Sequence, residues 1–152
     1  MRYMFCLLIV VVFASFEAPG SGTAYLTCKS ESGRTVFNAE LQDIVGLLEK
    51  AELVVDNKSL VFDDKDDVRT IFDKETGVFT VCISGAPTKE FPNGRFVEFW
   101  AIPKSFKIIK SERSNQRYEF KAKIEATEPR GGGNRSLRIP QVLLSCVLEY
   151  RI

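Results

Sequence analysis

The side chains able to do chemistry are cysteines, carboxylates, lysines and serines, because the 152 residues include no histidine. Histidine is the usual general base and a common zinc or copper ligand. Without it, catalysis would need paired carboxylates, a Ser-Lys dyad or a thiolate. No carboxylate pair lies in an apolar context that would raise one pKa, and no cysteine has a nucleophile-type setting. We therefore predict no enzyme activity, no catalytic residue and no cofactor.

A cluster of four aspartates is the strongest candidate for a metal site. Residues 63–67 read Asp-Asp-Lys-Asp-Asp, and calcium prefers such oxygen ligands. However, the spacing does not match the twelve-residue calcium loop, and the glycine of that loop is missing. Aspartates also favour solvated turns, where they bond to their own backbone. We expect a turn here and no metal site.

The N-terminal residues 1–14 have the pattern of an export signal. Arg2 precedes an apolar run, and Val12 and Ala14 are the small residues of a cleavage site. We expect cleavage after Ala14, with cleavage after Gly20 as the alternative. A membrane anchor is less favoured, because the apolar run is shorter than the roughly 20 residues that span a bilayer. The chain is thus expected to be exported, to the periplasm or outside the cell, with no transmembrane segment in its mature form.

Loss of the leader also removes Cys6 and leaves Cys28, Cys82 and Cys146. Three cysteines in an oxidising compartment suggest one disulfide, and three pairings are open. We favour Cys28–Cys146, because both lie on predicted strands near the ends of the domain, and first and last strands are often neighbours in a closed sheet. Cys82 lies in an apolar run and is predicted to be a core residue.

Strict alternation of apolar and charged residues from Tyr118 to Ala126 is the clearest structural signal in the chain. Such alternation predicts a strand with one buried face. After a flexible segment at 15–23, residues 24–152 are expected to form one all-β domain of about 8–10 short strands, an antiparallel barrel or barrel-like sandwich. We also expect a short helix or turn near 43–50. The predicted strands cover 24–30, 35–42, 53–55, 60–62, 68–72, 78–83, 95–102 (apolar on both faces, so covered on both), 106–110, 118–126, 137–139 and 141–152.

Charge is distributed unevenly along the chain. Residues 40–75 carry 11 acidic and 5 basic side chains, whereas residues 104–152 carry 5 acidic and 11 basic ones. One reading is a basic face for an acidic partner such as a polysaccharide or an anionic lipid. The reading we favour is that the two regions lie in one sheet and pair across strands. Nucleic acid is not expected, because the basic residues lack interleaved exposed aromatics. The basic candidates are Lys121, Lys123, Arg130, Arg135 and Arg138.

Two loops are candidate binding elements, because loops on a rigid sheet often carry function. One begins at Ser84 and Gly85 and extends to Gly94, and the other contains three glycines between Arg130 and Arg135. Two Asn-x-Ser sequons, at Asn57 and Asn134, allow glycosylation in a eukaryotic source.

Residues 25–33, Tyr-Leu-Thr-Cys-Lys-Ser-Glu-Ser-Gly, resemble the opening strand of bacterial periplasmic lysozyme inhibitors. That resemblance implies a small exported barrel with a disulfide, and a Ser-Gly loop that plugs the lysozyme cleft. Ser84-Gly85 would be its counterpart. The family's later Ser-Gly motif with an aromatic residue is absent, since Ala86 and Pro87 follow Gly85.

The expected function is therefore binding. Our first hypothesis is an exported, monomeric, non-catalytic module that binds or inhibits another macromolecule. The second is a carrier that holds a small apolar ligand inside the barrel, lined by phenylalanines. The third is a relative of the lysozyme inhibitors.

Overall fold

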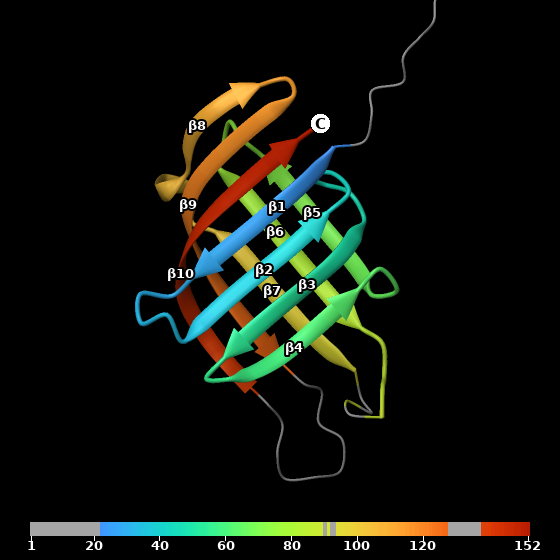
Figure 1. The fold of residues 1–152 in the computed structure, drawn as a ribbon. Coiled ribbons are helices and arrows are strands. Elements are labelled where there is room, and N and C mark those ends of the chain that lie inside the picture. Colours follow the sequence, from blue (N-terminus) through green and yellow to red (C-terminus); the bar gives the residue numbers. More distant parts are fainter. Residues whose placement is uncertain (1–21, 90, 92–93, 128–137) are drawn as a thin grey trace, which may run out of the picture.

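The computed structural model describes residues 22–89, 91, 94–127 and 138–152, and it confirms an all-β, barrel-like fold. One antiparallel sheet curls into a half-barrel (Figure 1). No α-helix occurs in the described ranges. The elements are β1 (Thr23–Lys29), β2 (Thr35–Leu41), β3 (Leu48–Val55), β4 (Lys58–Asp63), β5 (Asp67–Asp73), β6 (Val78–Gly85), β7 (Arg95–Ala101), the 3₁₀ turn η1 (Pro103–Ser105), β8 (Lys107–Glu112), β9 (Asn115–Thr127) and β10 (Arg138–Arg151).

The strand order is β4-β3-β2-β1-β10-β9-β7-β6-β5, with β8 paired to β9. Both β7 and β8 run antiparallel to β9, which has 13 residues and is long enough to pair with the two in succession. Proline has no N–H to donate to a ladder, so Pro103 ends β7 and η1 separates it from β8. The pair β7 and β8 thus acts as one long strand that is broken in the middle.

The inward faces of the strands fill the barrel with apolar side chains. The alternation predicted for Tyr118–Ala126 is confirmed: Tyr118, Phe120, Ala122, Ile124 and Ala126 are buried in β9. Aromatic rings from five strands and from the segment before β8 contact one another, with centroid separations of 5.2–6.2 Å. Such contacts add to the stabilisation that burial of the rings provides.

The first and last strands are neighbours in the middle of the sheet. Seven residue pairs join β1 to β10, and Cys28 lies directly opposite Cys146. The two form a disulfide with a Cα–Cα distance of 4.1 Å, as predicted. A disulfide fits an oxidising compartment and so an exported protein. Within the described ranges, no helix has the length and hydrophobicity needed to cross a bilayer. The predicted leader at 1–14 lies outside the described residues.

The predicted helix or turn near 43–50 is a turn followed by a strand. Asp43 accepts hydrogen bonds from the N–H groups of Ile44, through its side chain, and Gly46, through its carbonyl. These bonds close a tight turn, and β3 begins at Leu48. The spacing of Leu41, Ile44, Val45, Leu48 and Ala51 suggested a helix. Four of the five are buried from two strands and a turn, whereas Val45 is exposed.

Several other boundaries differ from the sequence-based prediction. The two strands predicted at 137–139 and 141–152 are one strand, β10, with a bulge between Ile139 and Val142 that accommodates Pro140. The polar segment 111–117 contains only a short turn at Arg113 and Ser114. The flexible segment predicted at 15–23 reaches one residue too far, since Thr23 belongs to β1.

Two burial predictions were wrong because residues that alternate in a strand point to opposite faces. Phe79, Val81 and Ile83 point inward from β6, so Cys82 points outward and is only half-buried. Likewise, the outward residues of β7, among them Trp100, are partly exposed rather than covered.

Candidate functional site

The break between β7 and β8 is bridged by one serine. Two residues of β9, Phe120 and Lys121, lie opposite the break. The N–H of Lys121 donates to Ser105 Oγ at 2.8 Å, and the Ser105 hydroxyl donates to the carbonyl of Ile102 at 2.7 Å. The N–H of Ile102 donates to the carbonyl of Lys121 at 2.8 Å. Ser105 thereby replaces a missing strand residue and holds η1 against the edge of β9.

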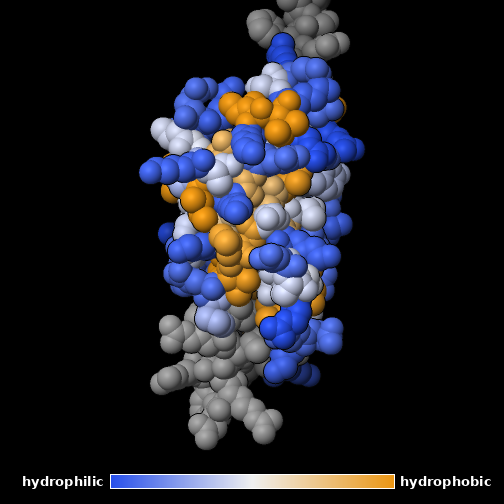
Figure 2. Space-filling model, turned by 90° about the vertical axis from the view of Figure 1, so that its left-hand side faces the viewer, coloured by the Kyte–Doolittle hydropathy of each residue, from blue (hydrophilic) through white to orange (hydrophobic). Residues whose placement is uncertain are grey.

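A groove of about 510 Å³ opens beside this break, and we call it the lysine groove. Its lining includes the half-buried Val147 of β10 and also Phe120 of β9, whose ring is buried in the barrel interior. Lys107 and Lys121 are exposed and lie in β8 and β9. Figure 2 looks at this side of the molecule, where apolar surface lies in a hollow between hydrophilic side chains. The lining residues are Ser105, Lys107, Glu119, Phe120, Lys121, Ser145, Cys146 and Val147.

The lysines around the groove are not neutralised by carboxylates. Among the described residues, Lys104, Lys107, Lys121 and Lys123 form no ion pair. Glu119 lines the groove, but it accepts a hydrogen bond from Arg117 at 3.1 Å. The lysine groove therefore has an excess of positive charge.

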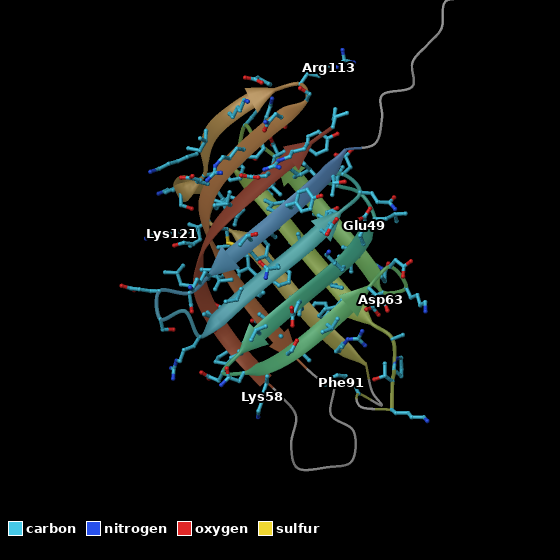
Figure 3. The ribbon with its side chains drawn as sticks, viewed as in Figure 1. Glu49, Lys58, Asp63, Phe91, Arg113 and Lys121 are labelled. Carbon is cyan, nitrogen blue, oxygen red and sulfur yellow. A yellow bond between two sulfur atoms is a disulfide. The ribbon has the colours of Figure 1, made fainter. Side chains whose placement is uncertain are left out.

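The predicted pairing between the acidic region 40–75 and the basic region 104–152 is not found. No ion pair between described residues joins the two regions. The reason is the strand order, which places β1 and β2 between β3 and β4 of the acidic region on one side and β9 and β10 of the basic region on the other. Figure 3 shows this separation: Lys121 lies on the left of the barrel and Asp63 on the right. The charge asymmetry of the sequence thus persists on the folded surface.

A second groove, of about 540 Å³, lies on the outward face of β1–β4. It is shaped by short outward side chains, such as Thr27 and Asn38, beside the longer Tyr25. Lys50 donates to Glu40 at 2.7 Å across this groove, and that hydrogen bond raises the pKa of Lys50. Because its cation is paired, this groove lacks the charge excess of the lysine groove.

The opposite side of the barrel contains a buried ion pair. The sheet ends at β4 and β5, which do not pair with each other. The guanidinium of Arg95 lies in the seam between them and donates to Asp66 at 2.9 Å, to the carbonyl of Val61 at 2.7 Å and to that of Ala86 at 3.2 Å. It also lies over the ring of Phe62, 4.9 Å from the centroid. The side chains of Arg95 and Asp66 are 9% and 4% exposed.

The aspartate cluster at 63–67 forms a turn, as expected. Asp63 accepts a hydrogen bond from the N–H of Lys65, and Asp66 accepts from the N–H groups of Asp63 and Ala86. The carboxylates of Asp63 and Asp66 thus accept hydrogen bonds from backbone N–H groups, and that of Asp66 also accepts one from Arg95. Among the described residues, no three Cys, Asp or Glu side chains gather in a geometry that would hold a metal ion.

Ser84 and Gly85 are not loop residues. They end β6 and pair with Phe96 and Arg95 in β7. Ser84 is exposed, whereas Gly85 is buried, and a Cβ on Gly85 would lie 2.6 Å from Cγ of Arg95. Asn57 lies in an exposed turn with a φ of +66°, a conformation that asparagine tolerates. Arg130, Asn134 and Arg135 lie outside the described residues.

Sequence reasoning identified Lys121 but missed Ser105, Lys107 and Arg95. A signal existed for Arg95. It alternates with Val97 and Phe99, so its side chain lies on the inward face of β7, where a charged group needs an oppositely charged or hydrogen-bonding partner. For Ser105 and Lys107 the only signal was Pro103, which marks the end of a strand but not where the chain goes next.

The chain was compared with protein-family models, with curated proteins and with solved structures, and no match was found in any of the three.

Proposed function

We propose that this protein is an exported, non-catalytic binding module that binds an acidic protein partner through the lysine groove. The observation that carries the proposal is that Lys107 and Lys121, which form no ion pair with a described residue, lie beside the apolar Val147. Export is supported by the leader pattern at residues 1–14 and by the disulfide.

The apolar surface around the lysines favours a protein over a polysaccharide or a lipid headgroup as the partner. Ile109 on β8 and Leu143 on β10 are 51% and 52% exposed on the two strands that flank β9. A protein segment that carries both carboxylates and apolar side chains complements such a mixture, whereas a polysaccharide presents mainly hydroxyl and acidic groups. Opposite charges also raise association rates and reject partners of like charge.

Synthetic ligands of defined charge test this proposal directly. The probes are a peptide of alternating glutamate and leucine, poly-glutamate and dextran sulfate, each labelled for fluorescence anisotropy. We expect the alternating peptide to bind most tightly, and its affinity to fall as salt rises. If dextran sulfate binds and neither peptide does, the partner is not a protein and the proposal fails.

A charge-reversal variant locates the site. Combining Lys107→Glu with Lys121→Glu should weaken peptide binding by at least about tenfold, since like charges then face the ligand. The matched control combines Lys58→Glu with Lys65→Glu, which changes net charge equally at exposed positions in β4 and in the turn after it, away from Lys121 (Figure 3). An equal loss in both variants would show that only net charge matters. With the site located, capture of proteins from the native compartment, compared between wild type and the groove variant, would identify the partner.

The two other hypotheses have less support. A carrier needs an internal cavity, whereas the aromatic side chains that were expected to line one contact each other across the interior, as Phe37 does with Phe99. A lysozyme inhibitor of the proposed type needs Ser84-Gly85 on a projecting loop, and both residues are in β6. Fluorescence of an apolar dye and a lysozyme inhibition assay test these two hypotheses separately.

A further inference from the structure

Strand β5 is an edge strand of the sheet. Among the described residues it pairs only with β6. Its outward side chains are exposed, and Ile71, at 63%, is more exposed than the outward apolar side chain of β4, Val61 at 56%. Edge strands with free N–H and C=O groups can pair with another strand.

The other end of the sheet, β4, is protected. Its Val61 carbonyl accepts a hydrogen bond from Nε of Arg95 at 2.7 Å, and the guanidinium lies over the ring of Phe62. No described side chain forms a hydrogen bond of this kind with the main chain of β5. Of the two strands that flank the seam, β5 is therefore the one that remains able to accept a partner strand.

The sequence of β5 is complementary to itself in one register. When two copies pair about a two-fold axis, outward residues face outward residues. Three such registers overlap by at least five residues within Asp67–Asp73. The first places Arg69 opposite Arg69, and the second places Asp67 opposite Asp73. The third places Ile71 opposite Ile71, with Arg69 opposite Asp73 on each side of it.

We propose that two copies of this chain associate through antiparallel pairing of their β5 strands in this third register. The pairing buries Ile71 against its symmetry mate and forms two Arg69–Asp73 pairs, so it gains apolar contact and opposite charges together. Within the monomer, Arg69 has only a weak alternative, a 3.7 Å pair with Asp67 in which both side chains are well exposed. A dimer replaces the monomer that we expected from the sequence.

This dimer is independent of the proposed function. Strand β5 contributes no residue to the lysine groove, which is lined by residues of η1, β8, β9 and β10, although Phe72 of β5 contacts Phe106 and Tyr118 inside the barrel. Peptide binding and self-association are measured separately, and either proposal can fail alone.

Sedimentation analysis of the wild-type protein over a range of concentrations tests the association. We expect a monomer–dimer equilibrium, and Ile71→Lys should weaken it by at least about tenfold because it places two cations face to face. Ile109→Lys is the matched control, since it replaces an exposed isoleucine of β8. A wild type that stays monomeric at high micromolar concentration overturns the proposal, as does an equal effect of both substitutions.

Cysteine cross-linking tests the register. In a Cys82→Ser background, Ile71→Cys places two thiols opposite each other, so mild oxidation should give a covalent dimer. Arg69→Cys in the same background self-pairs only in the first register. A covalent dimer from Arg69→Cys and none from Ile71→Cys would refute the register proposed here.

Discussion

The two places where the first and second halves of the sheet meet are built by opposite means. At β1–β10, seven residue pairs and the Cys28–Cys146 disulfide form a continuous ladder. At the β4–β5 seam the described residues form no strand pairs, and the guanidinium of Arg95 bonds to Asp66, Val61 and Ala86. A ladder satisfies every main-chain group along its length, whereas one side chain satisfies only a few. That difference explains why the seam leaves β5 with a free edge.

The largest effect is expected from breaking the seam. Arg95→Met leaves Asp66 buried without its cation, which should cost about 3–5 kcal/mol of unfolding free energy. Urea denaturation measures this cost. The control adds Asp66→Leu: because the unpaired charge is then removed, the double variant should recover part of the loss. If the double variant is as unstable as Arg95→Met alone, the ion pair is not what holds the seam.

Removing the disulfide between β1 and β10 should lower the unfolding free energy somewhat less. Replacing Cys28 and Cys146 with alanine frees a loop of 118 residues in the unfolded chain, for an expected loss of about 2–4 kcal/mol. The β1–β10 pairs remain, so the variant should keep its β-sheet circular dichroism while its denaturation midpoint falls. Loss of the sheet signal in native buffer would mean that the ladder depends on the disulfide.

A smaller loss of unfolding free energy is expected at the break between β7 and β8, where the Ser105 hydroxyl replaces the hydrogen bonds of a strand pair. Ser105→Ala removes the acceptor for the N–H of Lys121, at a cost of about 1 kcal/mol. Amide hydrogen exchange at Lys121 should accelerate while exchange in the β1–β10 ladder is unchanged. Unchanged exchange at Lys121 would show that water replaces the hydroxyl without loss.

The smallest effect concerns pH at the end of β5. The Thr76 hydroxyl, with the N–H of Glu75, holds the pKa of Asp73 below its usual value. A lowered pKa contributes stability that is present above the unfolded-state pKa and is lost as the pH falls through the folded value. By NMR titration, Thr76→Val should move the pKa of Asp73 upward. An unchanged pKa would assign the shift to the backbone donors alone.

The reactivity of Cys82, which is outside the disulfide, tests whether its side chain lies half-buried on the outward face of β6. Burial, followed by the nearby Glu98, raises the pKa of Cys82. Its reaction with iodoacetamide in the native protein should therefore be slower than that of an exposed cysteine at neutral pH, and should speed up as the pH rises through the raised pKa. A reaction as fast as in the unfolded chain would contradict the half-buried position on β6.

The strand pattern was predictable where alternation was regular, as in β9, because the period of side-chain direction is fixed by backbone geometry. The prediction failed at Leu41–Ala51, where the spacing of apolar residues also fitted a helix. It also failed around Cys82 and Trp100, where both faces of a strand carry apolar residues, so the buried face could not be chosen. In those places the choice depends on which residues meet across the barrel, and local spacing does not contain that information.

By itself, the sequence determined the all-β class, the favoured disulfide and the uneven charge, since these follow from periodicity, cysteine placement and composition. Only the tertiary structure decided whether the opposite charges meet, which side chains line the groove, and that Arg95 bridges the seam. Each of these depends on the order of strands in the sheet, which brings together residues far apart in the chain. The same order separates β3 and β4, which belong to the acidic region 40–75, from β9 and β10, which belong to the basic region 104–152.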